Sequence, residues 1–447
     1  MVRRWWAPYA LVGSELPRVE WGVLFEEDDG RLTRVVPGVA APPDATRLTG
    51  LAVPGLANAH SHAFHRALRG RTHFQGGTFW TWRRQMYSLA ERLDPDSYRR
   101  LARLVYAEMA LAGITSVGEF HYLHHDIGGI RYDDQNAMGL ALVDAAREAG
   151  PRITLLDTCY LTGGIDKPLE GVQLRFGDND AHGWAVRAAD LAGRPETAAP
   201  GVRIGAAIHS VRAVPASGLR VVADWATSHG APLHAHLSEQ RAENDMCRAA
   251  HGCTPTELLS RHGALGPDTT LVHATHLSVP DITELGASGA SVCLCPTTEQ
   301  DLADGIGPGR ALADACGTPA LGSDGHSVID VFAEARAVEL HERLRTETRG
   351  HFTPQELWSA ATSAGHTALG WPDAGWLDTG ARADIVTLDL DSVRLAGVDP
   401  SAAIHAATAS DVVDVVIDGE QVVSAGIHLR VPDVSAEMRE VIGQLWG

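Results

Sequence analysis

The stretch that decides the fold is Leu56-Ala57-Asn58-Ala59-His60-Ser61-His62, which follows Pro54-Gly55 near the start of the chain. It is an apolar run that ends in two histidines spaced two residues apart. Because a strand alternates its side chains between two faces, His60 and His62 point the same way and can bind one metal ion. Taken alone, this spacing also fits two histidines of the core or the surface that bind no metal, so the metal interpretation depends on further ligands.

Three more apolar runs end in histidine or acidic residues. They are Leu233-His234-Ala235-His236-Leu237-Ser238-Glu239, Leu271-Val272-His273 and Leu321-Gly322-Ser323-Asp324. We expect His236 as the third ligand and Asp324 as the fourth, a mixed nitrogen and oxygen set that suits zinc or a similar divalent ion. His234 shares the face of His236 and is the alternative ligand, although the reach of Glu239 favours His236. The pattern predicts a metal-dependent hydrolase.

Three of these residues are candidates for catalysis. Glu239 lies just past a strand end, where it could act as a general acid and base; a surface loop glutamate is the alternative. His273 could bind the metal or hold the attacking water. The alternative is a core histidine whose hydrogen bonds are made within the protein. Asp324 could take a proton from that water, against the alternative of a helix N-cap.

Eight strand-like runs, mostly separated by segments with helical periodicity, follow one another in the middle of the chain. They cover residues 51–62, 114–120, 153–161, 203–210, 232–238, 270–278, 291–297 and 320–326. This alternation predicts an α/β fold, a (β/α)8 TIM-like barrel over residues 51–377, with catalytic groups at the carboxyl ends of its strands. Residues 1–50 and 378–447 contain short strand-like runs, and we expect a small β-sandwich built from both chain termini, followed by a tail.

The composition of the chain limits the kinds of molecule that it can bind. The 447 residues carry a formal net charge of −19, which argues against nucleic acid or an anionic membrane, because phosphate groups require basic surface. A small anionic substrate remains compatible, since it responds to the local field of its pocket. No run approaches transmembrane length, no convincing signal peptide is present, and the six scattered cysteines suit reduced thiols. We therefore expect a cytoplasmic protein.

Two other segments bear on the number of metal ions. The run over 203–210 leads into His209-Ser210-Val211-Arg212 and contains no lysine, which would have indicated a carbamate bridging two metals. Its absence favours a single ion. His121, His124 and His125 could form a second metal cluster, but a solvated loop is the favoured interpretation.

Taken together, these motifs resemble the amidohydrolase superfamily and, within it, the formimidoylglutamate deiminase family. The resemblance covers essentially the whole chain. Its most specific stretches are His60-Ser61-His62-Ala63-Phe64, Phe79-Trp80-Thr81-Trp82-Arg83, Glu119-Phe120-His121-Tyr122-Leu123-His124-His125, His209-Ser210-Val211-Arg212 and Cys295-Pro296-Thr297-Thr298-Glu299. The histidine motif is common to the superfamily, whereas the Phe-Trp-x-Trp-Arg and Glu-Phe-His-Tyr segments bear on the substrate.

The resemblance implies a reaction and a set of site residues. The reaction is zinc-dependent hydrolytic deimination of N-formimino-L-glutamate to N-formyl-L-glutamate and ammonia, a step of histidine degradation. One Zn2+ ion would be bound by His60, His62, His236 and Asp324, with Fe2+ or Mn2+ possible at the same ligands, and Glu239 and His273 would be the catalytic partners. His65, Arg83, Tyr122, His209 and Arg212 would line the pocket for a small dicarboxylate, which guanidinium groups can bind with paired hydrogen bonds.

Three departures from the family bear on the substrate. His65 stands where the family has glutamine, Gly325 stands where serine is usual, and the segment between residues 69 and 79 is short. The alternative function is another deaminase of the superfamily, such as a ring deaminase or an enzyme like imidazolonepropionase. A non-catalytic barrel scaffold is the alternative from a different class, but it would not need a complete ligand set. By analogy with other barrels we expect a homodimer.

Overall fold

The computed structural model describes residues 2–14, 17–73 and 79–447. Its centre is a parallel sheet of eight strands that runs in order from β6 to β13 and forms a nearly closed barrel. The strands are β6 (Leu56–Ser61), β7 (Ile114–His121), β8 (Arg152–Cys159), β9 (Val202–Ile208), β10 (Leu233–Leu237), β11 (Thr269–His273), β12 (Ser291–Leu294) and β13 (Ala320–Leu321). A parallel bridge between Ser61 and Asp324 joins the first strand to the segment after the last. The predicted TIM-like barrel is confirmed.

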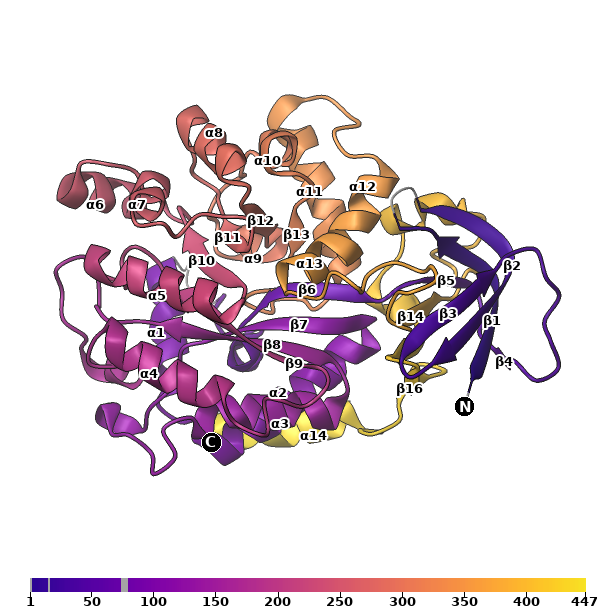
Figure 1. Cartoon of the computed structure of the whole chain (residues 1–447), viewed down its shortest axis with the longest axis horizontal. Helices are drawn as coiled ribbons and strands as arrows, with labels where there is room; N and C mark the ends of the chain where they lie inside the picture. The colour runs from indigo at the N-terminus through magenta and orange to yellow at the C-terminus, as the bar shows by residue number, and fades with distance from the viewer. Residues whose placement is uncertain (1, 15–16, 74–78) are drawn as a thin grey trace.

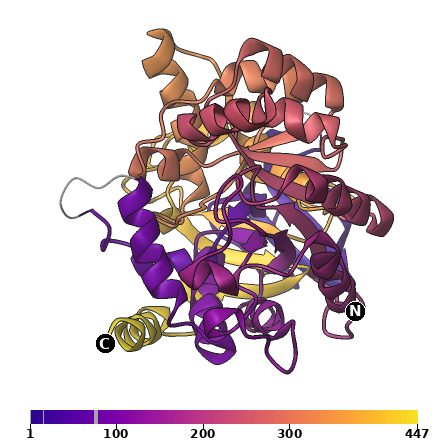
Figure 2. The same ribbon diagram turned by 90° about the vertical axis from the view of Figure 1, so that its left-hand side faces the viewer.

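Helices surround the strands, as Figure 2 shows from the side away from the terminal sheet. They are α1 (Phe79–Ala90), α2 (Pro95–Leu111), α3 (Ala137–Ala149), α4 (Ala181–Ala192), α5 (Ala216–His229), α6 (Arg241–His251), α7 (Pro255–Arg261), α8 (Val279–Ser288), α9 (Pro296–Asp301), α10 (Gly309–Cys316), α11 (Val331–Thr346), α12 (Pro354–Ser359), α13 (Gly365–Ala368) and α14 (Val434–Trp446). A π-helical turn covers Ala360–Ala364, and 3₁₀ turns cover Ala63–Leu68, Ile127–Gly129, Gly171–Arg175, Pro400–His405 and Ala409–Asp411. None of the described helices is long and apolar enough to cross a membrane.

The expected strand over residues 51–62 is divided in the structure. Leu51–Pro54 forms β5, which pairs with strands of a second sheet, and only the part after Gly55 enters the barrel as β6. A Cβ atom at Gly55 would collide with the side chain of Thr115, so glycine allows the chain to pass from one sheet to the other. The second sheet therefore extends to Pro54. Residues 74–78 of the short segment noted above lie outside the described residues.

The second sheet is built from both ends of the chain, seen in indigo and yellow in Figure 1. Its strands are β1 (Arg3–Val12), β2 (Arg18–Asp28), β3 (Arg31–Val36), β4 (Thr46–Arg47), β5, β14 (Ile385–Leu388), β15 (Val412–Ile417), β16 (Glu420–Ser424) and β17 (Ile427–His428). The expected small β domain is thus present as one mixed sheet. The tail after it returns to the barrel, where α14 lies against α2 and Trp446 Nε1 donates to the Ala67 carbonyl at 3.0 Å.

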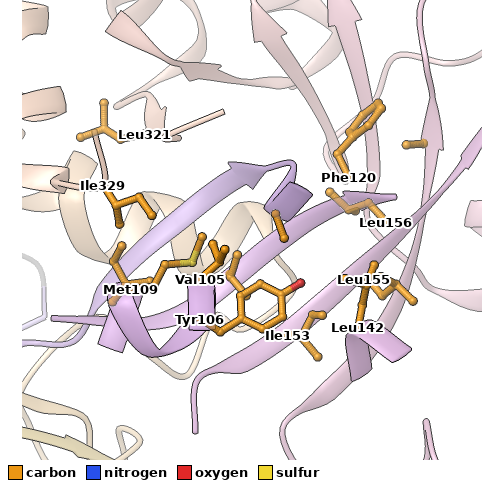
Figure 3. Packing of buried hydrophobic residues seen from close by; sticks show 14 of the residues in the cluster. Val105, Tyr106, Met109, Phe120, Leu142, Ile153, Leu155, Leu156, Leu321 and Ile329 are labelled. Carbon is orange, nitrogen blue, oxygen red and sulfur yellow. The ribbon is translucent and has the colours of Figure 1, made fainter. Parts of the chain in front are cut away.

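The largest core cluster fills the space between the barrel strands and the surrounding helices. Figure 3 shows Val105, Tyr106 and Met109 of α2 with Ile153 of β8 nearby, and Phe120 of β7 further along the barrel beside Leu156. These side chains are at most 1% exposed. The apolar residues of α2 recur at helical spacing, so one face of the helix packs against the barrel. The sheet opposite it presents alternate side chains to this layer.

A buried ion pair joins the barrel to the terminal sheet. Arg152, the first residue of β8, donates from one terminal nitrogen to Asp384 Oδ1 at 2.9 Å and from the other to Asp384 Oδ2. The two side chains are 2% and 1% exposed. Asp384 also accepts a hydrogen bond from the backbone N–H of Asp418 at 2.9 Å. Without the Asp384 charge, the buried guanidinium group of Arg152 would keep Asp418 as a carboxylate partner, 3.0 Å away and 32% exposed, and would lose its buried partner.

We therefore expect Asp384→Asn to lower the free energy of unfolding by about 3 kcal/mol, the scale for breaking a buried ion pair. The measurement is urea unfolding followed by circular dichroism. The matched control is Asp224→Asn, because Asp224 forms an exposed pair with Arg220 at 3.8 Å and exposed pairs contribute little. Equal losses in the two variants would contradict the assignment of this pair as the joint between the sheets.

Candidate active site

Four side chains from the carboxyl ends of three strands converge at one point. His60 and His62 come from the end of β6, His236 from β10 and Asp324 from the segment after β13. One possible ligand atom from each lies within 4.8 Å of all the others, and all four residues are buried. The Asp324 Oδ1 atom is 3.4 Å from His60 Nε2 and 3.3 Å from His62 Nε2, and His60 Nε2 is 3.1 Å from His236 Nε2.

The hydrogen bonds behind these histidines decide which nitrogen faces the centre. His62 Nδ1 is 2.9 Å from the carbonyl oxygen of Phe120, and His236 Nδ1 is 2.7 Å from that of His209. A carbonyl oxygen only accepts, so both Nδ1 atoms carry the proton and both Nε2 atoms carry a lone pair. Burial lowers the pKa of His62 and His236, which disfavours a second proton there. Lone pairs and a carboxylate that face one another in this way fit a bound divalent cation.

A chain of buried hydrogen bonds fixes the two segments that carry the ligands. Asn58 Nδ2 donates to Ser323 Oγ at 2.7 Å, and Ser61 Oγ donates to Glu119 Oε2 at 2.7 Å. The ring of His326 lies between the two serines, 2.9 Å from Ser323 Oγ and 3.1 Å from Ser61 Oγ. Each group can therefore donate to the next in one direction, from Asn58 through Ser323, His326 and Ser61 to Glu119. Hydrogen bonds of this kind orient ligands before metal binding.

His273, the last residue of β11, lies beside the four-residue cluster. Its Nε2 atom is 3.7 Å from Asp324 Oδ2, and its Nδ1 atom is 3.5 Å from Glu299 Oε1. Burial lowers the pKa of His273, but the carboxylates of Glu239, Glu299 and Asp324 outweigh burial and raise that pKa to about 10. Its φ angle of 71° is unusual for a residue with a side chain and is typical of functional sites. Cys295 could complete a second donor group with His273 and Asp324, but burial raises its pKa and keeps the thiol protonated.

Glu239 follows β10 and faces the same centre. Its carboxyl group is buried, and burial raises its pKa despite the opposing charges of His273 and Arg212. The guanidinium group of Arg212 approaches it, with Nη2 3.9 Å from Glu239 Oε2. The structure thus brings a carboxyl group that can hold a proton next to a permanent positive charge.

All the residues expected to line a substrate pocket lie around one cavity beside this cluster. The cavity is lined by His62, His65, Trp82, Arg83, Met86, Tyr87, Tyr122, Tyr160, Phe176, His209, Arg212, His236, Glu239, His273, Leu302 and Asp324. His65 Nε2 and the Tyr122 hydroxyl are 3.0 Å apart. Arg83 of α1 donates from Nε to the Tyr87 hydroxyl at 2.5 Å. The cavity therefore has one end formed by the candidate ligand cluster, two arginines, the carboxyl group of Glu239 and an aromatic wall.

The structure bears on two alternatives left by the sequence. His236 joins the ligand group, whereas His234 Nε2 is 2.9 Å from the Ala368 carbonyl and lies outside that group. Asp324 faces the histidines and caps no helix, because the next helix, α11, has Asp330 as its N-cap. His236 and Asp324 thus have the positions that the metal interpretation requires.

The prediction of a solvated loop for His121, His124 and His125 was wrong. All three side chains are at most 2% exposed. His124 Nε2 is 2.9 Å from the Thr158 carbonyl, and His125 Nε2 is 3.4 Å from Asp178 Oδ1. In the part of the chain that the structure describes, they join no group with metal-ligand spacing. They anchor the segment that presents the Tyr122 ring to the cavity.

Sequence reasoning missed several residues of the site. Tyr160 and Phe176 form part of the cavity wall, and Glu243 contacts Arg212 at 3.0 Å. Tyr160 directly follows β8, so the rule that functional groups follow barrel strands could have identified it. Glu243 comes four residues after Glu239, but Glu239 lies outside α6, so this spacing gave no signal of a shared role. Phe176 comes from a loop with no comparable signal.

Comparison with known proteins identifies the family. Residues 51–422 match the amidohydrolase family. The chain is 35% identical to formimidoylglutamate deiminase of Pseudomonas aeruginosa, over 95% of this chain and 96% of that one. It is 31% identical to 5-methylthioadenosine/S-adenosylhomocysteine deaminase of Halobacterium salinarum, over 89% and 87% of the two chains. The crystal structure of an amidohydrolase from Brucella melitensis superposes with a TM-score of 0.91, at 31% identity and full coverage of both chains.

The family predicted from the motifs is therefore confirmed. The match spans all eight barrel strands and part of the terminal sheet, and it includes every residue of the histidine and aspartate cluster. This chain belongs to the amidohydrolase family and is a hydrolytic enzyme that acts on C–N bonds.

Proposed function

We propose that this amidohydrolase converts N-formimino-L-glutamate and water into N-formyl-L-glutamate and ammonia, a step of histidine degradation. The observation that carries the proposal is the pair of guanidinium groups, Arg83 and Arg212, on the cavity beside the metal-ligand cluster. In a chain with a net charge of −19, two such groups form a local site for a substrate with two carboxylates. The similarity to the Pseudomonas aeruginosa deiminase supports the same substrate.

The donor set favours a single zinc ion. His60, His62, His236 and Asp324 would hold it, because three imidazoles and one carboxylate suit zinc, while Fe2+ and Mn2+ accept the same donors. When bound, such an ion lowers the pKa of a coordinated water to about 7 and polarises the group that is attacked. Side chains of the protein hold the attacking water and transfer the protons.

Asp324 and His273 are suited to hold the attacking water. Asp324 turns Oδ1 toward the ligand histidines, which leaves Oδ2 on the side of His273 as the acceptor for a water proton. His273 can donate to the oxygen of that water from the opposite side. The imidazole is kept in place by Glu299, 3.5 Å from its Nδ1 atom.

Glu239 is suited to protonate the leaving nitrogen. Its raised pKa, caused first by burial, lets this carboxyl group carry a proton closer to neutral pH than an exposed glutamate does. Addition of the water oxygen to the formimino carbon makes that carbon tetrahedral. Glu239 protonates the imine nitrogen during this addition, so that the carbon carries one OH and one NH2 group. The C–N bond to that nitrogen then breaks: the nitrogen takes the water proton held by Asp324 and leaves as ammonia, while the hydroxyl proton passes to the Glu239 carboxylate and a C=O bond forms.

The polar groups of the pocket would bind the rest of the substrate. Arg212 can bind a carboxylate with paired hydrogen bonds from its terminal nitrogens, because its Nε atom is already used by Glu243. Arg83 lies in the same cavity with Tyr122, whose hydroxyl group is hydrogen-bonded to His65. His209 forms part of the wall between Tyr160 and His236, with ring centroids 4.4 Å and 5.1 Å away.

The first test is ammonia release from N-formimino-L-glutamate by the metal-loaded protein, with the organic product identified by mass. We expect ammonia and N-formyl-L-glutamate in equal amounts, and loss of both when a chelator removes the metal. The metal content should be one equivalent by elemental analysis. Release of ammonia from 5-methylthioadenosine instead would replace this substrate with that of a ring deaminase.

We expect Glu239→Gln to lower kcat by at least about 10²-fold, because the amide cannot supply the proton that the leaving nitrogen needs. Steady-state kinetics measures the effect, and elemental analysis serves as the control, since the variant should still hold one equivalent of metal. A fully active, metal-loaded variant would remove Glu239 from the mechanism.

We expect Arg212→Met to raise KM by about 10- to 100-fold, the scale for losing charge-assisted hydrogen bonds to a carboxylate. The matched control is Arg220→Met on the exposed face of α5, where the side chain is 59% exposed and KM should not change. An unchanged KM in Arg212→Met would exclude this residue from substrate binding.

A further inference from the structure

Glu243 is a fully buried carboxylate between two parts of the active site. It lies in the first turn of α6 and is 0% exposed. Its Oε2 atom accepts a hydrogen bond from Arg212 Nε at 3.0 Å. Its Oε1 atom accepts one from the backbone N–H of Ser238 at 3.4 Å. One carboxylate thus contacts both the pocket cation and the residue that precedes Glu239.

Two carboxylates, Glu243 and Glu239, lie near the guanidinium group of Arg212. Nε contacts Glu243, while Nη2 lies 3.9 Å from Glu239 Oε2, beyond hydrogen-bond distance. The Arg212 side chain is only 12% exposed, so water provides little competition for its charge. Without Glu243, the guanidinium group would have Glu239 as its neighbouring carboxylate. A direct Arg212–Glu239 pair would occupy the cation that binds substrate and would hold Glu239 in its ionised form.

The second contact of Glu243 supports an unusual backbone conformation. Ser238 has a φ angle of 51°, in the left-handed region that residues with side chains seldom occupy. Its carbonyl oxygen accepts from the His276 N–H at 3.0 Å, and its own N–H points to Glu243. Such conformations persist where surrounding contacts determine them. The turn at Ser238 decides the direction in which Glu239 leaves the strand.

We propose that Glu243 is a positioning residue that keeps Arg212 and Glu239 apart and aims each at the substrate. It holds the guanidinium group by Nε, so that the terminal nitrogens stay available to a carboxylate, and it holds the Ser238 turn from which Glu239 extends. The part that concerns substrate binding rests on the proposed function. The part that concerns the Arg212–Glu239 separation is a property of the protein alone.

The test is Glu243→Gln in the metal-loaded, full-length enzyme, a change that keeps size but removes the charge. We expect kcat/KM for N-formimino-L-glutamate to fall by about 10²-fold, which is what a displacement of about 1 Å at a catalytic group costs. Both constants should change, with KM raised through Arg212 and kcat lowered through Glu239. Values of KM and kcat equal to those of the wild type would overturn the proposal.

A double-mutant cycle separates positioning from a general structural role. In an Arg212→Met background, Glu243→Gln should no longer raise KM, because the side chain through which it acts is gone. The fall in kcat should persist, since the Ser238 contact does not involve Arg212. The same fold-change in KM in both backgrounds would show that Glu243 does not act through Arg212.

Glu339 supplies the matched control. It is also a buried carboxylate, 1% exposed, that accepts from an arginine Nε and from backbone N–H groups, at Arg343, Gly350 and Phe352. It lies on α11 and does not line the cavity. Glu339→Gln should therefore lower the melting temperature without changing KM or kcat. Changes in KM and kcat of equal size in both variants would assign the effect of Glu243 to stability.

The crystal structure of metal-loaded Glu243→Gln tests the inference without any substrate. We expect Arg212 to form a direct hydrogen bond with Glu239 and the Ser238 turn to shift. Unchanged positions of Arg212 and Ser238 would overturn the proposal. If the wild-type enzyme leaves N-formimino-L-glutamate intact while Arg212 moves in the variant, the proposed substrate fails and the positioning role of Glu243 stands.

Discussion

The backbone bridge at Asp324 joins the end of the barrel to its beginning: the Asp324 N–H donates to the His60 carbonyl oxygen at 3.0 Å, and the Asp324 carbonyl oxygen accepts from the His62 N–H at 3.4 Å. The rest of the site depends on this contact. It brings the last ligand next to the first two, so that closing the sheet and assembling the metal-ligand group are the same event. The strain at Asp324, whose φ angle is 38°, arises where the chain turns its carboxylate back into the barrel. The buried serine and histidine hydrogen bonds behind it make this turn the stable arrangement.

Electrostatics around the cluster follow from burial and from the placement of few opposite charges. The ligand histidines lose their affinity for protons because they are desolvated, as the pKa of about 3 for His60 shows. His273 behaves in the opposite way because three carboxylates surround it. Histidines that face the same centre from different strands, His60 from β6 and His273 from β11, therefore differ in their affinity for a proton. A strongly acidic chain also places two arginines, Arg83 and Arg212, on one cavity. The local arrangement of charge, not the net charge, decides which ligand fits.

The sequence predicted all four side chains of the candidate metal-ligand group because they obey simple rules. His60, His236 and Asp324 each follow a short apolar run, and parallel strands present their carboxyl ends at the same face. The split at Gly55 could not be predicted, because it depends on the close approach of Thr115, a residue of a neighbouring strand, which leaves no room for a Cβ atom at position 55. Burial of His121, His124 and His125 was missed because a run of polar residues indicates solvent unless its distant partners are known. Phe176 and Glu243 likewise take their roles from contacts that only the folded chain creates.

The junction at Gly55 has a thermodynamic consequence. The strand that pairs with both chain ends in the terminal sheet runs, after a single residue, into the strand that ends at His60 and His62. A ligand that binds only the folded state stabilises every segment that must be ordered for binding. Metal binding therefore stabilises the folded terminal sheet, and destabilising that sheet in turn weakens metal binding. Substitutions far from the cavity, on the terminal sheet, can change how tightly the enzyme retains its ion under conditions of metal scarcity.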